Sequence, residues 1–229
     1  MNKILIFCTV VLWCSLPAFF AHAQSQVQTL DDLMADSPNS QPIRKSNVGS
    51  IRIFDSRLIH PMPDWLPQEI KANPMSLTRV SRQEGKNTFQ IQMVPKEESI
   101  TEWRNLFAIM GLQNYGGTNA THARDIVRGF RVGCKPSNLN VRPLQGNPKI
   151  ALLVVICGSF AREPEIGEVG VFVLLQRGKT AVRLYREWRG PAFRSEDPSQ
   201  WLVTTRSLDR IIKAMTRARL LPLNNPIKP

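Results

Sequence analysis

The fold class is decided by the stretch IALLVVIC, residues 150–157. It is apolar throughout and rich in valine and isoleucine, which favour strands. Such a run predicts a central strand that is covered on both faces of a sheet. The next two segments, 167–175 and 180–189, predict a β-hairpin that turns at Arg177-Gly178. The second half of the chain therefore predicts the middle of a sheet.

Further strands are predicted on either side of this centre, at residues 51–54, 77–82, 88–94 and 139–144. The segment 88–94 alternates between apolar and polar residues, which is typical of an antiparallel strand with one buried face. Residues 99–111 fit both a helix and a buried strand, and we favour a short helical start followed by a strand.

Two helices are predicted, one from Thr118 or Asn119 to about residue 131 and one from Thr204 or Thr205 to about residue 220. Apolar residues of the second recur at helical spacing, at Leu208, Ile211, Ile212 and Met215. We therefore expect an α+β fold. It would have an antiparallel sheet of about five to seven strands packed by two or three helices, including a C-terminal amphipathic helix, and one disulfide.

The first 23 residues have the three parts of a secretory signal peptide. Lys3 supplies a positive charge, residues 4–20 are almost wholly apolar, and Ala21-His22-Ala23 is a small-residue cleavage site. The alternative is an uncleaved membrane anchor, because the apolar run is close to the length that spans a bilayer. We favour cleavage before Gln24, which predicts a periplasmic or secreted protein with no transmembrane span in its mature form.

Export bears on the cysteines, because Cys8 and Cys14 leave with the signal peptide and only Cys134 and Cys157 remain. An even pair in an oxidising compartment predicts a structural disulfide, worth roughly 3 kcal/mol. A redox pair or a pair of metal ligands is the alternative. The rest of the chain is expected to divide into a flexible polar arm at 24–50, a single domain at 51–220 and a disordered tail at 221–229.

Catalytic signals are sparse. A hydrolytic triad needs a base beside a nucleophile, and the two histidines of the mature chain, His60 and His122, lie in no such motif; we expect His122 to face water. Paired carboxylates could cleave glycosides, and the candidates are Glu97, Glu98, Glu102, Asp125, Glu163, Glu165, Glu168 and Glu187. We expect solvated charges there, and we expect no catalytic residue, metal site or cofactor.

The chain is basic, with 30 Lys and Arg against 18 Asp and Glu and a formal charge of +12. Residues 177–219 hold eleven Lys or Arg and four acidic residues. The candidate binding residues are Arg183, Arg189, Arg206, Arg210, Lys213 and Arg217. If the hairpin and the last helix adjoin, they form a patch that attracts anions. The alternative is a solvated face kept for solubility.

The strand Phe89-Gln90-Ile91-Gln92-Met93-Val94-Pro95, followed by the polar segment 97–102 and Trp103, resembles PsbP-like α+β domains. Residues 94–103 also resemble small exported bacterial proteins that have a cysteine pair in their second half. The resemblance extends by element order over about residues 77–220. It implies an adaptor or accessory role, and no family active-site residue carries over.

We therefore expect an exported, non-catalytic binding or accessory module of the bacterial cell envelope. Its basic C-terminal face would bind an anionic envelope component or an acidic protein rather than nucleic acid. The alternatives are an envelope hydrolase that uses paired carboxylates, and a component of a secretion or conjugation apparatus that is tethered through the 24–50 arm.

Overall fold

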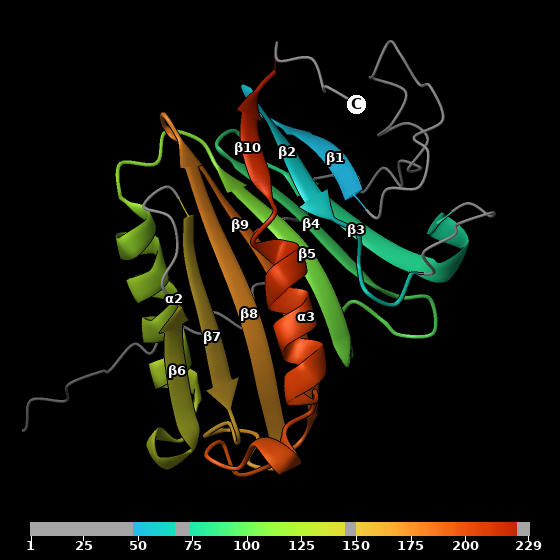
Figure 1. Ribbon diagram of the computed structural model, residues 1–229, viewed down its shortest axis with the longest axis vertical. Coiled ribbons are helices and arrows are strands. Elements are labelled where there is room, and N and C mark those ends of the chain that lie inside the picture. Colours follow the sequence, from blue (N-terminus) through green and yellow to red (C-terminus); the bar gives the residue numbers. More distant parts are fainter. Residues whose placement is uncertain (1–47, 67–73, 145–149, 224–229) are drawn as a thin grey trace, which may run out of the picture.

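The computed structural model describes residues 48–66, 74–144 and 150–223. Within them, two antiparallel sheets and two α-helices form three layers (Figure 1). The central layer is a seven-stranded sheet with the order β3-β4-β5-β9-β8-β7-β6. Helix α2 covers part of one face, and helix α3 lies on the other face together with a three-stranded sheet, β1-β2-β10. The expected antiparallel sheet with packed helices is present, and most of the described chain is sheet.

The large sheet consists of β3 (Thr78–Glu84), β4 (Thr88–Pro95), β5 (Asn105–Leu112), β6 (Leu139–Leu144), β7 (Ile150–Cys157), β8 (Ile166–Arg177) and β9 (Thr180–Pro191). The small sheet consists of β1 (Val48–Ile53), β2 (Ser56–Pro61) and β10 (Arg219–Pro222). The helices are α2 (Asn119–Gly133) and α3 (Thr205–Met215), with 3-10 turns η1 (Pro74–Leu77), η2 (Pro136–Asn138) and η3 (Pro198–Gln200). The predicted strands at 139–144 and 150–157 are confirmed.

Strand β7 is buried on both faces, as its apolar run predicts. Val154 and Ile156 belong to the core under α3, whereas Leu153 and Val155 belong to the core under α2. Because successive side chains of a strand point to opposite faces, an apolar residue at every position serves both cores. The hairpin from β8 to β9 is also confirmed. Its two-residue loop is Gly178-Lys179, and Gly178 has a φ of 55°, which glycine adopts at no steric cost.

Helix α2 begins as predicted, with Thr118 as its cap. The Thr118 hydroxyl accepts a hydrogen bond from the Thr121 N–H at 3.2 Å. Ile126 is buried against the sheet, and Ala123, Val127 and Phe130 pack around it at helical spacing. The Phe130 ring meets the edge of Phe172 on β8, with 5.9 Å between centroids. This apolar stripe holds α2 on the β6-β7-β8 half of the sheet.

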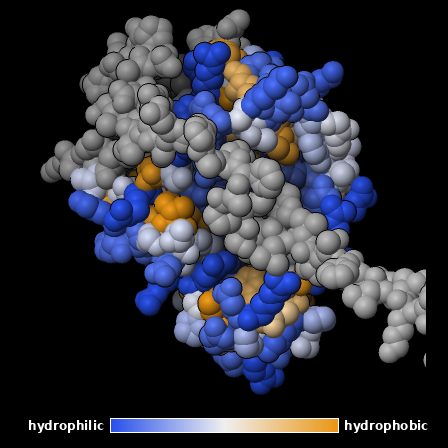
Figure 2. Space-filling view, turned by 180° about the vertical axis from the view of Figure 1, so that it is seen from behind, coloured by the Kyte–Doolittle hydropathy of each residue, from blue (hydrophilic) through white to orange (hydrophobic). Residues whose placement is uncertain are grey.

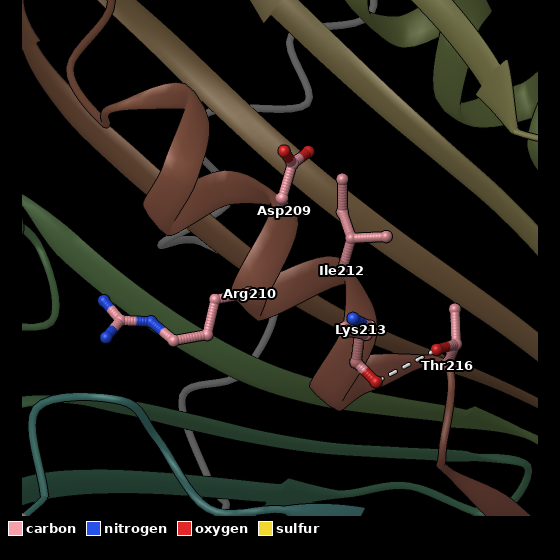
Figure 3. Close-up of a pocket in the computed structure, with 5 residues that line it drawn as sticks. All are labelled: Asp209, Arg210, Ile212, Lys213 and Thr216. Atoms are coloured by element: carbon pink, nitrogen blue, oxygen red, sulfur yellow. Dashed lines mark hydrogen bonds between the residues drawn. The ribbon is translucent and has the colours of Figure 1, made fainter.

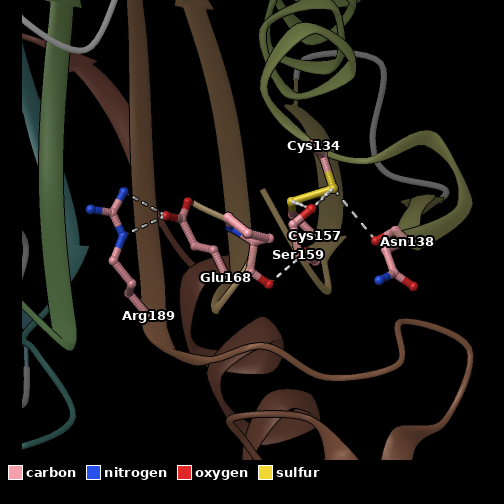
Figure 4. The surroundings of a disulfide bond; sticks show 7 residues. Cys134, Asn138, Cys157, Ser159, Glu168 and Arg189 are labelled. Atoms are coloured by element: carbon pink, nitrogen blue, oxygen red, sulfur yellow. Dashed lines mark hydrogen bonds and ion pairs between the residues drawn. A yellow bond between two sulfur atoms is a disulfide. The ribbon is translucent and has the colours of Figure 1, made fainter. Parts of the chain in front are cut away.

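The predicted disulfide between Cys134 and Cys157 is confirmed (Figure 4). It joins the residue after α2 to the last residue of β7, and the two Cα atoms are 5.7 Å apart. Both cysteines are almost fully buried. The bridge therefore fastens the C-terminal end of α2 to the sheet.

Exposed apolar surface is limited in the part of the chain that the structure describes. The large apolar residues that are exposed there are Val48, Leu77 and Val132. On the side seen in Figure 2, apolar residues form separate spots among hydrophilic ones. None of the described helices has the length and apolar character needed to cross a membrane.

Both ends of the domain differ from the sequence prediction. Val48 already belongs to β1, although we placed 48–50 in the polar arm, and β2 was not predicted at all. Helix α3 ends at Met215 rather than near 220, and β10 runs into the expected tail as far as Pro222. The reason is long-range pairing, since β2 binds β1 on one side and β10 on the other. The signal peptide expected at residues 1–23, residues 24–47 of the expected arm and residues 224–229 of the expected tail lie outside the described residues.

The expected helical start of the 99–111 segment is wrong. Residues 99–104 form no helix, and the strand β5 begins at Asn105. The Glu98 carboxylate accepts hydrogen bonds from the backbone N–H groups of Arg104 at 2.6 Å and Asn105 at 2.8 Å. A carboxylate that binds two consecutive N–H groups stabilises a turn in place of a helix.

We expect Cys134→Ser combined with Cys157→Ser to lower the free energy of unfolding by about 3 kcal/mol, because the unbridged chain regains loop entropy in its unfolded state. Urea denaturation followed by circular dichroism measures the change. Reduction of the wild-type disulfide should give the same loss, and reduction of the double variant should have no effect. An unchanged urea midpoint would show that the bridge is not a structural constraint.

Candidate functional site

The outer face of α3 carries the basic residues that the sequence indicated. Thr204 caps the helix by accepting a hydrogen bond from the Ser207 N–H at 3.2 Å, and Leu208, Ile211 and Met215 are buried. The basic residues repeat at offsets of 4, 7 and 11 residues and are all exposed: Arg206, Arg210, Lys213 and Arg217. This spacing places Arg206, Arg210 and Lys213 on one side of α3, and Arg217 follows in the turn after Met215. These four residues are called the α3 face below.

The charge of the α3 face is not neutralised by its neighbours. Among the described residues, no acidic group lies within ion-pair distance of these four side chains. Asp209 and Lys213, which are four residues apart on α3, form no ion pair. Arg210 donates to the Ser207 hydroxyl at 3.3 Å, which leaves its charge in place. The α3 face thus projects net positive charge into solvent.

Figure 3 shows a depression on the surface of this helix. It is lined by Asp209, Arg210, Ile212, Lys213 and Thr216. The Thr216 hydroxyl donates to the Lys213 backbone carbonyl at 3.1 Å and so closes the last turn. The depression is open and has an acidic residue in its wall, so it is not an enclosed site for a small anion.

Arg183 and Arg189 do not belong to this surface, so the condition for a single patch with the hairpin, that the two faces adjoin, is not met. On β9, Val182, Leu184 and Trp188 lie in the core under α3, so Arg183 and Arg189 lie on the opposite face of the sheet. The alternation along β9 puts Arg183 and Arg189 on the same face of the sheet. The sequence did not show which of the two faces α3 would cover.

Both hairpin arginines are held by partners on the α2 side. Arg189 donates to one oxygen of Glu168 from Nε at 3.2 Å and from Nη2 at 3.0 Å (Figure 4). Its guanidinium also lies over the Trp103 ring, 4.5 Å from the centroid. Arg183 donates to Nε2 of His122 at 3.0 Å and 3.3 Å. These two arginines stabilise the interior of the fold.

Of the predicted acidic candidates, the structure brings Glu168 and Glu187 together. Their side chains are 4 % and 8 % exposed, and the two carboxyl groups are hydrogen-bonded to each other. Gly170, the cross-strand partner of Glu187, makes room for the Phe172 ring beside this pair, since a Cβ there would lie 2.5 Å from Phe172 Cε2. The other candidates are scattered in exposed or half-buried positions at Glu97, Glu98, Glu102, Asp125, Glu163 and Glu165.

Burial is the main reason that the pKa of Glu187 lies well above its usual value of 4.5, and the neighbouring Glu168 carboxylate raises the pKa further. Burial also raises the pKa of Glu168, but the ion pair with Arg189 opposes this shift. The hydrogen bond between the two carboxyl groups raises the pKa of Glu187 further and lowers that of Glu168, so the protonated form is favoured on Glu187. Both carboxyl groups are buried and occupied with protein partners, so they leave no room for a substrate.

The two histidines are buried, which corrects the expectation that His122 faces water. His60 is 5 % exposed and its ring packs on Phe107, and burial lowers its pKa to about 4. His122 is 3 % exposed, and burial, together with the charge of Arg183, lowers its pKa to about 4. Because Arg183 donates to Nε2, the neutral ring of His122 carries its proton on Nδ1. Both rings are interior packing elements.

Arg186 is a buried cation that the sequence did not single out. It lies between the rings of Trp65 and Trp188, at 4.9 Å and 4.3 Å from their centroids. It donates to Asp64 at 2.7 Å and to the backbone carbonyls of Leu106 at 3.3 Å and Glu187 at 2.6 Å. Asn105 accepts a further hydrogen bond at 3.0 Å. Every side of the guanidinium is therefore engaged within the protein.

Within the described residues, His, Cys, Asp and Glu side chains form no group that could hold a metal ion. Comparison of the whole chain with protein-family models and with curated proteins finds no match.

We expect the free energy of unfolding to show the proton held by Glu187. A group whose pKa is raised by folding stabilises fully below its unfolded pKa, near 4.5, and this contribution is lost as the pH rises through the folded pKa. Relative to Glu187→Gln, the wild type should therefore lose up to about 1.4 kcal/mol per pH unit across that range. Urea denaturation from about pH 5 to pH 8 measures the difference.

His60 and His122 change the free energy of unfolding in the opposite direction as the pH rises. Their lowered pKa values favour folding above their usual pKa of 6.5. The two histidines contribute equally to both proteins, so the difference between wild type and variant reports on the coupled Glu187–Glu168 pair. Glu163→Gln, at an exposed position, is the matched control and should follow the wild type. A wild type and a Glu187→Gln variant with parallel pH profiles would show that Glu187 is ionised in the fold.

Proposed function

We propose that the chain is an exported, non-catalytic binding or accessory module of the bacterial cell envelope. It is an α+β domain that binds an anionic partner through the α3 face. The observation that carries this proposal is a set of four exposed cations, three on one side of α3 and the fourth in the turn that follows it, with no acidic partner among the described residues. A fold that needs none of these charges for its own packing leaves them available to another molecule.

The location follows from the leader at residues 1–23, which directs the chain across a membrane. A buried disulfide between Cys134 and Cys157 agrees with an oxidising compartment. The resemblance to PsbP-like domains implies an adaptor or accessory role. In the envelope, the anionic candidates are lipid headgroups, acidic polymers and acidic proteins.

A hydrolase that works through paired carboxylates receives less support. The two carboxyl groups that lie together, Glu168 and Glu187, are buried in the sheet and bound to Arg189 and to each other. Hydrolysis requires a carboxyl group on each side of a bound substrate. The role in a secretion or conjugation apparatus depends on the 24–50 arm, of which residues 24–47 lie outside the described residues.

Affinity capture from the native envelope fraction tests the proposal. We expect the wild type to retain its partner at low salt and to release it as salt is raised, because ions screen exposed charges within about 10 Å at 0.1 M. Replacing Arg206, Arg210, Lys213 and Arg217 together by Ala should weaken binding at least about tenfold. The folds of variant and wild type are compared by circular dichroism.

The matched control replaces four exposed arginines elsewhere by Ala, at Arg124, Arg128, Arg131 and Arg162. It removes the same formal charge, so it separates the α3 face from net charge. Equal loss in both variants, or capture that does not depend on salt, would contradict the proposal.

A further inference from the structure

The outer side of the small sheet carries three arginines. Two of them lie on β1 and β2, far from α3 in the sequence, and the third lies on β10, which follows α3. Ile53, Leu58 and Leu220 of the sheet's three strands pack toward the core. Because side chains alternate along a strand, Arg52, Arg57 and Arg219 point to the opposite side. Arg52 and Arg219 are exposed, and Arg57 is half-buried.

Two of these arginines face each other across the sheet. Arg52 on β1 and Arg57 on β2 are direct cross-strand partners, and like charges in such a pair destabilise a sheet. Arg219 on β10 pairs with Ile59, two residues from Arg57. It also donates to the backbone carbonyls of Thr216 at 3.0 Å and Ala218 at 2.8 Å, after the end of α3. Arg52 donates to the Phe54 backbone carbonyl at 3.3 Å, a bond that leaves its charge in place. An anionic partner would relieve the repulsion between Arg52 and Arg57.

The small sheet and the α3 face lie on the same side of the molecule. Both pack on one face of the large sheet, since Ile53 and Leu58 share a core cluster with Leu208 and Ile211 of α3. Helix α3 is followed after three residues by β10 (Figure 1), so Arg217 and Arg219 stand where the chain passes from one surface to the other. Together they hold Arg52, Arg57, Arg206, Arg210, Lys213, Arg217 and Arg219. We call these seven residues the basic layer.

Acidic residues on the same elements do not cancel this charge. Asp209 on α3 has no ion pair with a residue of the basic layer. Asp55, in the turn between β1 and β2, accepts hydrogen bonds from Thr180 at 2.8 Å and from Arg177 at 3.4 Å on the large sheet. The excess of cations on this side is therefore large.

Apolar residues lie among these cations. Val48, 43 % exposed, shares the outer side of the small sheet with the partly exposed Ile59 and Leu221. A partner for this surface must therefore be broad and anionic, with hydrocarbon close beneath its charges. A bilayer with anionic headgroups has these properties.

We propose that the basic layer docks the protein on a bilayer that contains anionic phospholipid. This inference rests on the proposed function, because it names the partner of the α3 face and extends the binding surface to the small sheet. Each cation of the layer strengthens attachment by about fivefold, the factor that corresponds to about 1 kcal/mol per basic residue near an anionic surface. An acidic protein as the partner is the alternative outcome of the test.

Vesicle flotation with the exported form of the protein tests the inference. We expect binding to vesicles of phosphatidylglycerol and phosphatidylcholine and none to vesicles of phosphatidylcholine alone, with release at high salt. Replacing Arg52, Arg57 and Arg219 together by Gln should weaken binding about 100-fold. The exposed arginines of α2, replaced by Gln at Arg124, Arg128 and Arg131, are the matched control and should change it less than about threefold.

Replacing Arg219 could destabilise the protein, because its side chain also donates to the carbonyls at the end of α3. A second variant therefore leaves Arg219 in place. The double variant Arg52→Gln with Arg57→Gln removes the repelling pair, so its thermal stability should equal or exceed that of the wild type. Its binding should nevertheless fall about 25-fold.

The outcomes separate this inference from the proposed function. One result is a wild type that fails to bind phosphatidylglycerol vesicles while its capture from the envelope still requires the α3 face. That result would contradict the bilayer as partner and would indicate an acidic protein or polymer. Vesicle binding that survives loss of Arg52, Arg57 and Arg219 overturns the extension to the small sheet. If neither capture nor vesicle binding changes when the residues of the α3 face are replaced, the proposed function is contradicted as well.

Discussion

The alternation of side chains along β9 is the constraint on which the rest of the structure depends. Strand β9 lies between β5 and β8 in the middle of the large sheet, and both of its faces are covered. Leu184 and Trp188 complete the core under α3, while Tyr185 and Phe172 stack in the core under α2 with 5.7 Å between ring centroids. A strand in this position cannot slip by one residue without exchanging the contents of the two cores.

The same alternation explains the buried charges. Every charged residue of β9 that faces a core must find a partner there, because an unpaired buried charge is costly. Arg189 meets Glu168 on the α2 side, and Arg186 meets Asp64 on the α3 side. The second pair also joins the layers, since Asp64 and Trp65 follow β2 in the chain and lie over the large sheet through Arg186. A hydrophobic residue at 186 could fill the volume, but it would not hold this connection in one orientation.

Local patterns in the sequence were sufficient for much of the sheet and for both helix starts. The apolar run of β7, the alternation of β4 and the cap at Thr118 each report on neighbouring residues alone. The small sheet could not be predicted in this way, because β1 and β10 come from opposite ends of the domain and meet only through β2. The turn at Phe54 and Asp55 gives no signal either, since Phe54 has a φ of 53° without being a glycine or asparagine.

The candidate site also contains residues that local sequence patterns identified and residues whose place depends on long-range packing. Three of the four residues of the α3 face lie on one helix and the fourth follows it directly, so local spacing identified the face. The place of Arg183 and Arg189 depended instead on which face of the sheet the helix covers. Arg52 and Arg57 escaped notice because each stands in a short strand without a local excess of charge. They join the cations of α3 only when β2 pairs with β1 and β10. A surface assembled from both ends of the domain exists only in the folded protein, so any partner that needs all of it binds the fold and not the unfolded chain.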